Sequence, residues 1–140
     1  MSHGIVLTGD KMRTVLFADD VEEVRRLSCA ALRQHGYTVL TARDGLEALS
    51  LAREHRDPID LLITDVMMPR LGGPDLCRAL KTCHPEARVL FISGYPADEL
   101  DEAASFLQKP FTPRVLLRRV GELLPERSAA LELRSDALRV

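Results

Sequence analysis

Five short apolar runs alternate with five stretches of helical periodicity, and this alternation constrains the fold of the chain more than any other feature. The runs lie at 14–18, 37–42, 59–65, 88–94 and 105–109, and the helical stretches lie at 20–36, 44–56, 72–84, 96–104 and 112–124. Short runs that are almost continuously apolar are typical of strands buried on both faces. Strands that alternate with helices predict an α/β fold with a doubly wound five-stranded parallel sheet, covered by helices on both sides.

Local signals indicate where the helices begin and end. Asp20 is a candidate N-cap for the first helix, and Gly36 is a candidate for its end. Thr112 and Pro113 are suited to the N-cap and first position of the last helix. The apolar residues of the first helix share one face at helical spacing: Val24, Leu27, Ala31 and Leu32.

Polar residues stand at the ends of four predicted strands. Asp19 and Asp20 follow the first run, Asp65 ends the third, Ser93 lies at the end of the fourth and Lys109 ends the fifth. In a doubly wound sheet of order 2-1-3-4-5, ligands bind beyond the carboxyl ends of the strands, where the strand order reverses. We therefore expect all five side chains to meet at one rim of the sheet.

Three carboxylates at one rim repel each other. Two unit charges about 4 Å apart cost roughly 4 kcal/mol at an effective dielectric near 20, so the cluster requires a cation. Oxygen ligands without histidine or cysteine favour Mg²⁺ or Mn²⁺ over zinc. A lysine and a hydroxyl at the same rim suit a phosphoryl group. Because the chain has no Walker motif and no G-x-G-x-x-G, we expect no bound nucleotide to deliver that group, and an aspartate can itself be the nucleophile.

Four motifs at these positions resemble a known family. "FADD", "LLITDVMMPRLGG", "FISG" and "FLQKPF", in this order, are similar to the receiver (CheY-like) domain of two-component response regulators. The wording "SGY…FLQKPFTP" looks most like receivers attached to hybrid histidine kinases. The resemblance covers residues 13–124 and implies a (βα)5 flavodoxin-like fold, with tails at 1–12 and 125–140.

The resemblance also implies roles for single residues. Asp65 is the implied phosphoacceptor, Lys109 pairs with a phosphate oxygen, and Ser93 contacts the acyl phosphate and carries the switch. The implied metal ligands are Asp20, Asp65 and the backbone carbonyl of Met67, with Asp19 acting through a metal-bound water.

Further positions take their expected roles from the same resemblance. Phe106 stands where an aromatic side chain rotates inward on activation, and the Lys109–Pro110 peptide bond is expected to be cis. Met67 and Tyr95 are expected to flank the phosphate, where their bulk would hinder attacking water and slow self-dephosphorylation.

One segment is shorter than the family pattern. Only 15 residues, 94–108, lie between Ser93 and Lys109. The fourth helix, at 96–104, is therefore expected to be shortened to two turns or less. A dimer built on the fourth helix, fifth strand and fifth helix would then be weak or altered. We therefore expect a monomer or weak dimer.

Composition excludes several classes of function. A net charge of −2 and a pI of about 6.1 give no support for binding to nucleic acid or to a membrane surface. No apolar run is long enough to span a membrane, no signal peptide is recognisable, and three cysteines without export signals suggest reduced thiols in the cytoplasm. We also expect no DNA-binding output domain on this chain.

Three functional hypotheses follow. The leading one is a phosphoacceptor receiver domain in two-component signal transduction or a phosphorelay. It would take a phosphoryl group from a histidine kinase or histidine phosphotransfer protein, and it would not be an enzyme that turns over an external substrate. The alternative is a Mg²⁺-dependent phosphotransferase or phosphatase that acts on a small molecule through an aspartyl phosphate. The third is a degenerate receiver that only binds partners, although all the charged site residues are present.

Overall fold

The computed structural model describes residues 12–95, Leu100 and residues 104–125. These residues form five strands and four helices, which follow one another along the chain. The elements are β1 (Thr14–Ala18), α2 (Glu22–Gln34), β2 (Thr38–Ala42), α3 (Gly45–Glu54), β3 (Leu61–Asp65), α4 (Gly73–Cys83), β4 (Arg88–Ser93), β5 (Ser105–Gln108) and α5 (Pro113–Leu123).

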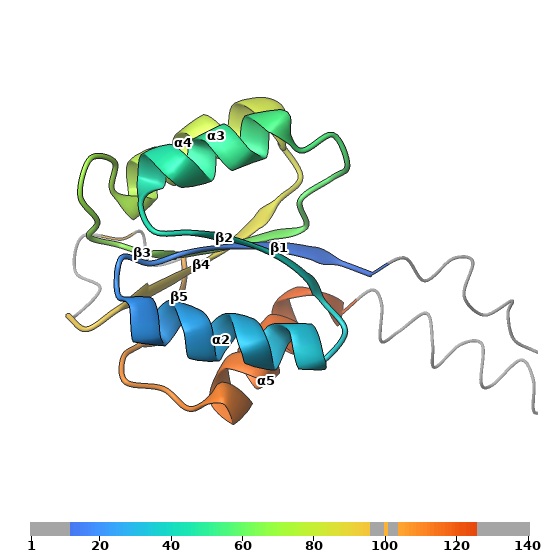
Figure 1. The fold of residues 1–140 in the computed structure, drawn as a ribbon, viewed down its shortest axis with the longest axis vertical. Coiled ribbons are helices and arrows are strands. Elements are labelled where there is room, and N and C mark those ends of the chain that lie inside the picture. Colours follow the sequence, from blue (N-terminus) through green and yellow to red (C-terminus); the bar gives the residue numbers. More distant parts are fainter. Residues whose placement is uncertain (1–11, 96–99, 101–103, 126–140) are drawn as a thin grey trace, which may run out of the picture.

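The strands form one parallel sheet in the order β2-β1-β3-β4-β5, which confirms the predicted topology. Figure 1 shows α3 and α4 on one face of this sheet and α2 and α5 on the other. β1 and β3 are neighbours in the sheet although α2, β2 and α3 separate them in the sequence. The strand order therefore reverses at β1, and the switch point lies between β1 and β3.

Two hydrophobic cores fill the space between the sheet and its helices. Successive side chains of a strand point to opposite faces, so Val15 and Phe17 join the core under α2 and α5, whereas Leu16 and Ala18 join the core under α3 and α4. All five residues of β1 and all five of β3 are buried. The near-continuous apolar runs of the sequence thus reflect strands that are covered on both faces.

The helix ends agree with the sequence signals at two places and differ at one. Thr112 caps α5 by accepting a hydrogen bond from the Val115 amide at 3.2 Å, as predicted. Gly36, with φ of 99°, follows the end of α2, also as predicted. Asp20 is not the cap of α2, because the helix begins after Val21 and no side chain caps it. Asp19 Oδ1 instead accepts a hydrogen bond from the Val21 amide at 2.9 Å, which leaves the exposed Asp20 carboxylate outside the helix.

Some predictions fall outside the residues that the structure describes. They concern most of the shortened helix expected at 96–104 and the two tails at 1–12 and 125–140, of which only Met12 and Pro125 are described. Within the described residues, no helix combines the length and the apolar character needed to cross a membrane.

Candidate functional site

Strand pairing brings the predicted site residues to one edge of the sheet. Asp19 directly follows β1, and its amide still donates to Ala42 of β2 at 3.1 Å. Asp65 is the last residue of β3 and pairs with Ile92 of β4. The Lys109 amide donates to the carbonyl of Ser93 at 2.8 Å and so extends the β4–β5 ladder by one residue. The carboxyl ends of four strands therefore present their polar side chains together.

Lys109 bridges two of the carboxylates. Its Nζ lies 2.8 Å from Asp19 Oδ2 and 2.9 Å from Asp65 Oδ2. The contact with Asp65 is a hydrogen bond, whereas the contact with Asp19 is an ion pair that lacks hydrogen-bond geometry. Asp19 Oδ2 is consequently a buried oxygen without a hydrogen-bond partner among the described residues. Such an atom is costly unless a further ligand satisfies it.

Burial and charge act against each other in this cluster. Burial raises the pKa of the Asp19 carboxyl above its ordinary value, although the contact with Lys109 and the hydrogen bond from Val21 oppose this shift. Burial disfavours the ammonium form of Lys109, but the contacts with Asp19 and Asp65 outweigh it and raise the Lys109 pKa. The lysine is therefore held in its charged form at neutral pH.

The donor set fits a hard divalent cation. One carboxylate oxygen from each of Asp19, Asp20 and Asp65 lies within 4.8 Å of the other two. Among the described residues, these three form the one group of possible metal ligands whose atoms lie this close together. Asp19 is buried, Asp65 is 7% exposed and Asp20 is exposed, so the cluster opens to solvent on the Asp20 side. Three converging carboxylates match the oxygen ligands that Mg²⁺ prefers.

The other predicted site residues surround this cluster. Ser93 is 3% exposed, and its Oγ accepts a hydrogen bond from the Tyr95 amide at 3.1 Å. The side chains of Tyr95 and Met67 are exposed, and the Met67 amide donates to Asp65 Oδ1 at 3.2 Å. Phe106 is half-buried in β5, where it pairs with Phe91 of β4. The Lys109–Pro110 peptide bond is cis, as the resemblance implies.

An apolar groove adjoins the cluster, and sequence reasoning missed it. A cavity of about 340 Å³ lies between α2 and the connection from β5 to α5, and Lys109 forms part of its wall. Its apolar lining comes from Val21, Val24, Leu27, Pro110, Phe111 and Pro113. Leu27 shares the apolar face of α2 but is 47% exposed, whereas the buried residues of this helix are Ser28, Cys29 and Leu32. The periodicity identified a helix face but not what covers it.

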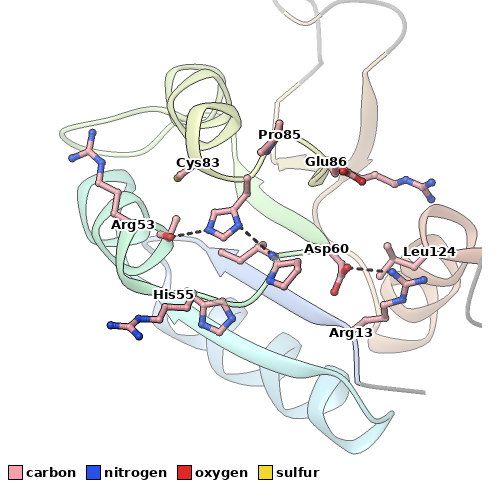
Figure 2. Close-up of a pocket in the computed structure, with 14 residues that line it drawn as sticks. Arg13, Arg53, His55, Asp60, Cys83, Pro85, Glu86 and Leu124 are labelled. Atoms are coloured by element: carbon pink, nitrogen blue, oxygen red, sulfur yellow. Dashed lines mark hydrogen bonds and ion pairs between the residues drawn. The ribbon is translucent and has the colours of Figure 1, made fainter. Parts of the chain in front are cut away.

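The opposite edge of the sheet holds a second cavity, of about 600 Å³, at the ends of α3, α4 and α5 (Figure 2). Arginines outnumber acids in its lining, which contains four arginines and two acidic residues: Arg13, Arg53, Arg56 and Arg88, with Asp60 and Glu86. A helix C-terminus carries a partial charge of about −0.5, so three of them offset roughly 1.5 of this positive charge.

Several of these polar groups are already paired. Arg13 pairs with Asp60 at 3.2 Å (Figure 2). His84 Nε2 lies 2.8 Å from the Ala52 carbonyl, and its Nδ1 accepts from the Ile59 amide at 3.3 Å. This edge is accordingly a structural junction between helix ends.

The fold and the site define a class of protein. It is an open doubly wound α/β domain whose switch point carries converging carboxylates, a charged lysine and a buried hydroxyl, which together suit a divalent cation and a phosphoryl group.

Comparison with known proteins defines this class further. The family model for the response regulator receiver domain matches residues 15–121. The sensor kinase CckA of Brucella abortus is 38% identical over 117 residues, which cover 79% of this chain but only 12% of that protein. The response regulator receiver protein CpdR of the same organism is 31% identical over 119 residues, which cover 81% of this chain and 98% of CpdR. The solved receiver domain of the hybrid histidine kinase CckA is 41% identical with a TM-score of 0.71, and the match covers 79% of this chain and 98% of that one.

The chain therefore belongs to the response regulator receiver domain family of two-component systems. This family is a signalling module rather than a turnover enzyme, and its members interact with histidine kinases or phosphotransfer proteins.

Proposed function

We propose that this chain is a phosphoacceptor receiver domain, which takes a phosphoryl group from phosphohistidine onto Asp65 and thereby changes a partner-binding surface. The bridge that Lys109 Nζ forms between Asp19 and Asp65 carries the proposal. It holds a positive charge 2.9 Å from the oxygen of the proposed nucleophile. A preorganised charge at this place stabilises the negative charge that gathers on a phosphoryl group during transfer.

The proposed transfer forms one bond to phosphorus and breaks another. One carboxylate oxygen of Asp65 forms the new P–O bond while the P–N bond of the phosphohistidine breaks. The electron pair of that bond remains on the imidazole nitrogen, which takes up a proton. The Lys109 ammonium contacts the Asp65 carboxylate before the transfer, and it would contact the phosphoryl oxygens after it. The Ser93 hydroxyl, buried at the end of β4, can donate to one of those oxygens.

The acidic cluster supports a metal-assisted reaction. We infer that Asp20, Asp65 and the carbonyl of Met67 hold Mg²⁺ or Mn²⁺, and that Asp19 acts through a metal-bound water. The proximity of the three carboxylates, and the lack of a hydrogen-bond partner for Asp19 Oδ2 among the described residues, support this assignment. A bound divalent cation supplies positive charge that offsets both the carboxylates and the incoming phosphoryl group.

The apolar groove between α2 and the β5–α5 connection is the proposed docking site of the phosphohistidine-bearing partner. Its lining includes Lys109, so a partner seated there presents its histidine beside the acidic cluster. Val21 and Leu27 are 46% and 47% exposed and line the same groove, so a partner seated there would cover both. The histidine kinase or histidine phosphotransfer protein is thus expected to bury these side chains.

The output is proposed to run through Ser93 and Phe106. The amide of Lys109 bonds to the Ser93 carbonyl at 2.8 Å, and Arg119 Nη1 of α5 bonds to the Phe106 carbonyl at 2.9 Å. Movement of the Ser93 hydroxyl toward a phosphoryl oxygen would therefore act on the strand that α5 contacts. An inward rotation of Phe106 would shift the population of conformations of the surface made by β5 and α5.

Intact mass after incubation with Mg²⁺ and a small acyl phosphate tests the proposal, with Asp65→Asn as the matched control. A gain of one phosphoryl group in the wild type alone is expected. No gain in the wild type, with Mg²⁺ bound, would refute phosphoryl acceptance from small donors and favour a receiver that only binds partners. Turnover of a generic phosphate ester would instead favour the small-molecule phosphatase. A cytoplasmic location and a monomeric or weakly dimeric state remain predictions.

A further inference from the structure

The loop at 66–72 joins the proposed phosphoacceptor strand β3 to α4. A hydrogen bond joins its two ends, and it also packs against α3. The Gly73 amide donates to the Val66 carbonyl at 2.9 Å and closes the loop on itself. The loop also lies against the start of α3, because a β-carbon added to Gly45 would lie 2.1 Å from the Leu71 carbonyl oxygen. No side chain larger than hydrogen fits at that contact, so the loop and α3 have a fixed separation there.

Arg70 has a backbone conformation that its residue type disfavours. Its φ is 72°, and among the described residues it is the one non-glycine residue with a positive φ. The Leu71 amide donates to the Pro69 carbonyl at 2.8 Å and closes a three-residue turn with Arg70 at its centre, where a positive φ is that of the rare and strained form of the γ-turn. The backbone of the loop holds this strain, whereas the side chain of Arg70 makes its contact outside the loop.

The contact that Arg70 makes is with Asp44, 26 residues away in the sequence. Arg70 Nη2 lies 2.5 Å from Asp44 Oδ2. The Asp44 side chain is 7% exposed, whereas that of Arg70 is 59% exposed. Asp44 Oδ1 caps α3 by accepting from the Glu47 amide at 2.8 Å, so both oxygens of this carboxylate are engaged. The helix cap therefore also holds the loop.

We propose that Arg70 is a positioning residue for the metal site, and that its ion pair with Asp44 holds the loop so that the Met67 carbonyl faces the carboxylate cluster. Met67 precedes Arg70 by three residues, and its own side chain is 64% exposed, so packing of that side chain does not fix the loop. Met68 anchors the loop on its core side, and Arg70 anchors it on the outer side. This inference rests on the proposed function, because it assumes the metal assignment.

Isothermal titration calorimetry with Mg²⁺, on the full chain, tests the inference with Arg70→Gly. This change removes the ion pair and also removes the β-carbon that disfavours a φ of 72°. We expect a melting temperature without metal at or above that of the wild type, together with Mg²⁺ affinity that falls by about tenfold, the lower end of the effect of residues that orient ligands. A purely structural role would lower both quantities together.

Matched variants make the inference sharper. Asp44→Asn keeps an oxygen for the α3 cap but loses the charge, so it should weaken Mg²⁺ binding as much as Arg70→Gly does. The double variant should be no weaker than either single one, because both remove the same interaction. Arg70→Lys keeps the charge and should retain part of the Mg²⁺ affinity that Arg70→Gly loses. In metal-free protein, hydrogen exchange of the Val66 and Met67 amides should be faster in Arg70→Gly than in the wild type.

The outcomes separate this inference from the proposed function. Unchanged Mg²⁺ affinity in Arg70→Gly, or additive losses in the double variant, would overturn the positioning role even though the wild type binds Mg²⁺ and accepts phosphoryl. A wild type that does not bind Mg²⁺ would overturn the metal assignment and this inference together. Unchanged amide exchange would also count against it, and this readout does not depend on metal.

Discussion

Replacement of Lys109 by methionine is the most direct test of the electrostatics at this site. Lys109 is 16% exposed and contacts two carboxylates, of which Asp19 is fully buried. Removal of one partner from a buried ion pair costs about 3–5 kcal/mol, because the other charge stays uncompensated. We expect the lower end, about 3 kcal/mol in metal-free protein, since the cluster opens to water at Asp20. For a domain of about this size, that loss corresponds to a melting temperature lower by about 12 °C.

Mg²⁺ should reverse part of this loss. Without the lysine, the three carboxylates lack a positive charge, so they should bind the cation more tightly and gain more stability from it. Urea unfolding of Lys109→Met and wild type, with and without millimolar Mg²⁺, measures both effects. The matched control is Lys81→Met, which removes the same charge and a single hydrogen bond to the Ala87 carbonyl, at a cost of about 1 kcal/mol. Equal metal-free stabilities of Lys109→Met and wild type, or a smaller Mg²⁺ response in the variant, would refute this reasoning.

Three further predictions concern stability, pH and the lifetime of the phosphorylated form. Gly45→Ala should destabilise the fold by about 3 kcal/mol in urea, because its β-carbon meets a backbone oxygen, whereas Gly121→Ala, with open space in α5, should gain about 0.5–1 kcal/mol. A hydrogen bond from the Glu47 amide and the Arg70 guanidinium hold the pKa of Asp44 below its ordinary value. The stability advantage of wild type over Asp44→Asn should thus be complete above about pH 4 and disappear as pH falls through the lowered pKa; an advantage that stays constant below pH 4 would contradict this. Met67→Ala should shorten the lifetime of the phosphorylated form several-fold in a mass-spectrometric time course, and an unchanged lifetime would exclude shielding by this exposed side chain.

Contacts that are local, or that the strand order dictates, were predictable from the sequence. The apolar runs identified every strand of the sheet, and the residue that ends each run identified Asp65, Ser93 and Lys109 as neighbours. This succeeds because parallel strands all point the same way, so that their carboxyl ends share one edge. Once the topology is known, no side-chain detail is needed to place these residues together.

Contacts that depend on how a loop meets a helix were not predictable. The pair of Arg70 and Asp44 joins residues 26 positions apart, and neither the loop sequence nor the helix cap indicates the other partner. The spacing of Leu27 places it on the apolar face of α2, but it does not indicate that this residue lines a groove. Periodicity reports which residues share a face, whereas the rotation of that face depends on packing of the whole domain.

The two edges of the sheet differ in their charges, and this difference supports the proposed function at the carboxyl edge. All helices of a doubly wound domain run antiparallel to the strands, so their C-termini, with their partial negative charge, gather at the amino edge. There the lining contains four arginines and His84 Nε2 lies 2.8 Å from the Ala52 carbonyl, although His55 Nε2 is buried without a hydrogen-bond partner among the described residues. At the carboxyl edge the chain places three carboxylates and only one lysine, and it leaves Asp19 Oδ2 without a hydrogen-bond partner among the described residues. The proposed cation would offset the charge of these carboxylates, and its binding would make this edge respond to a ligand that carries charge.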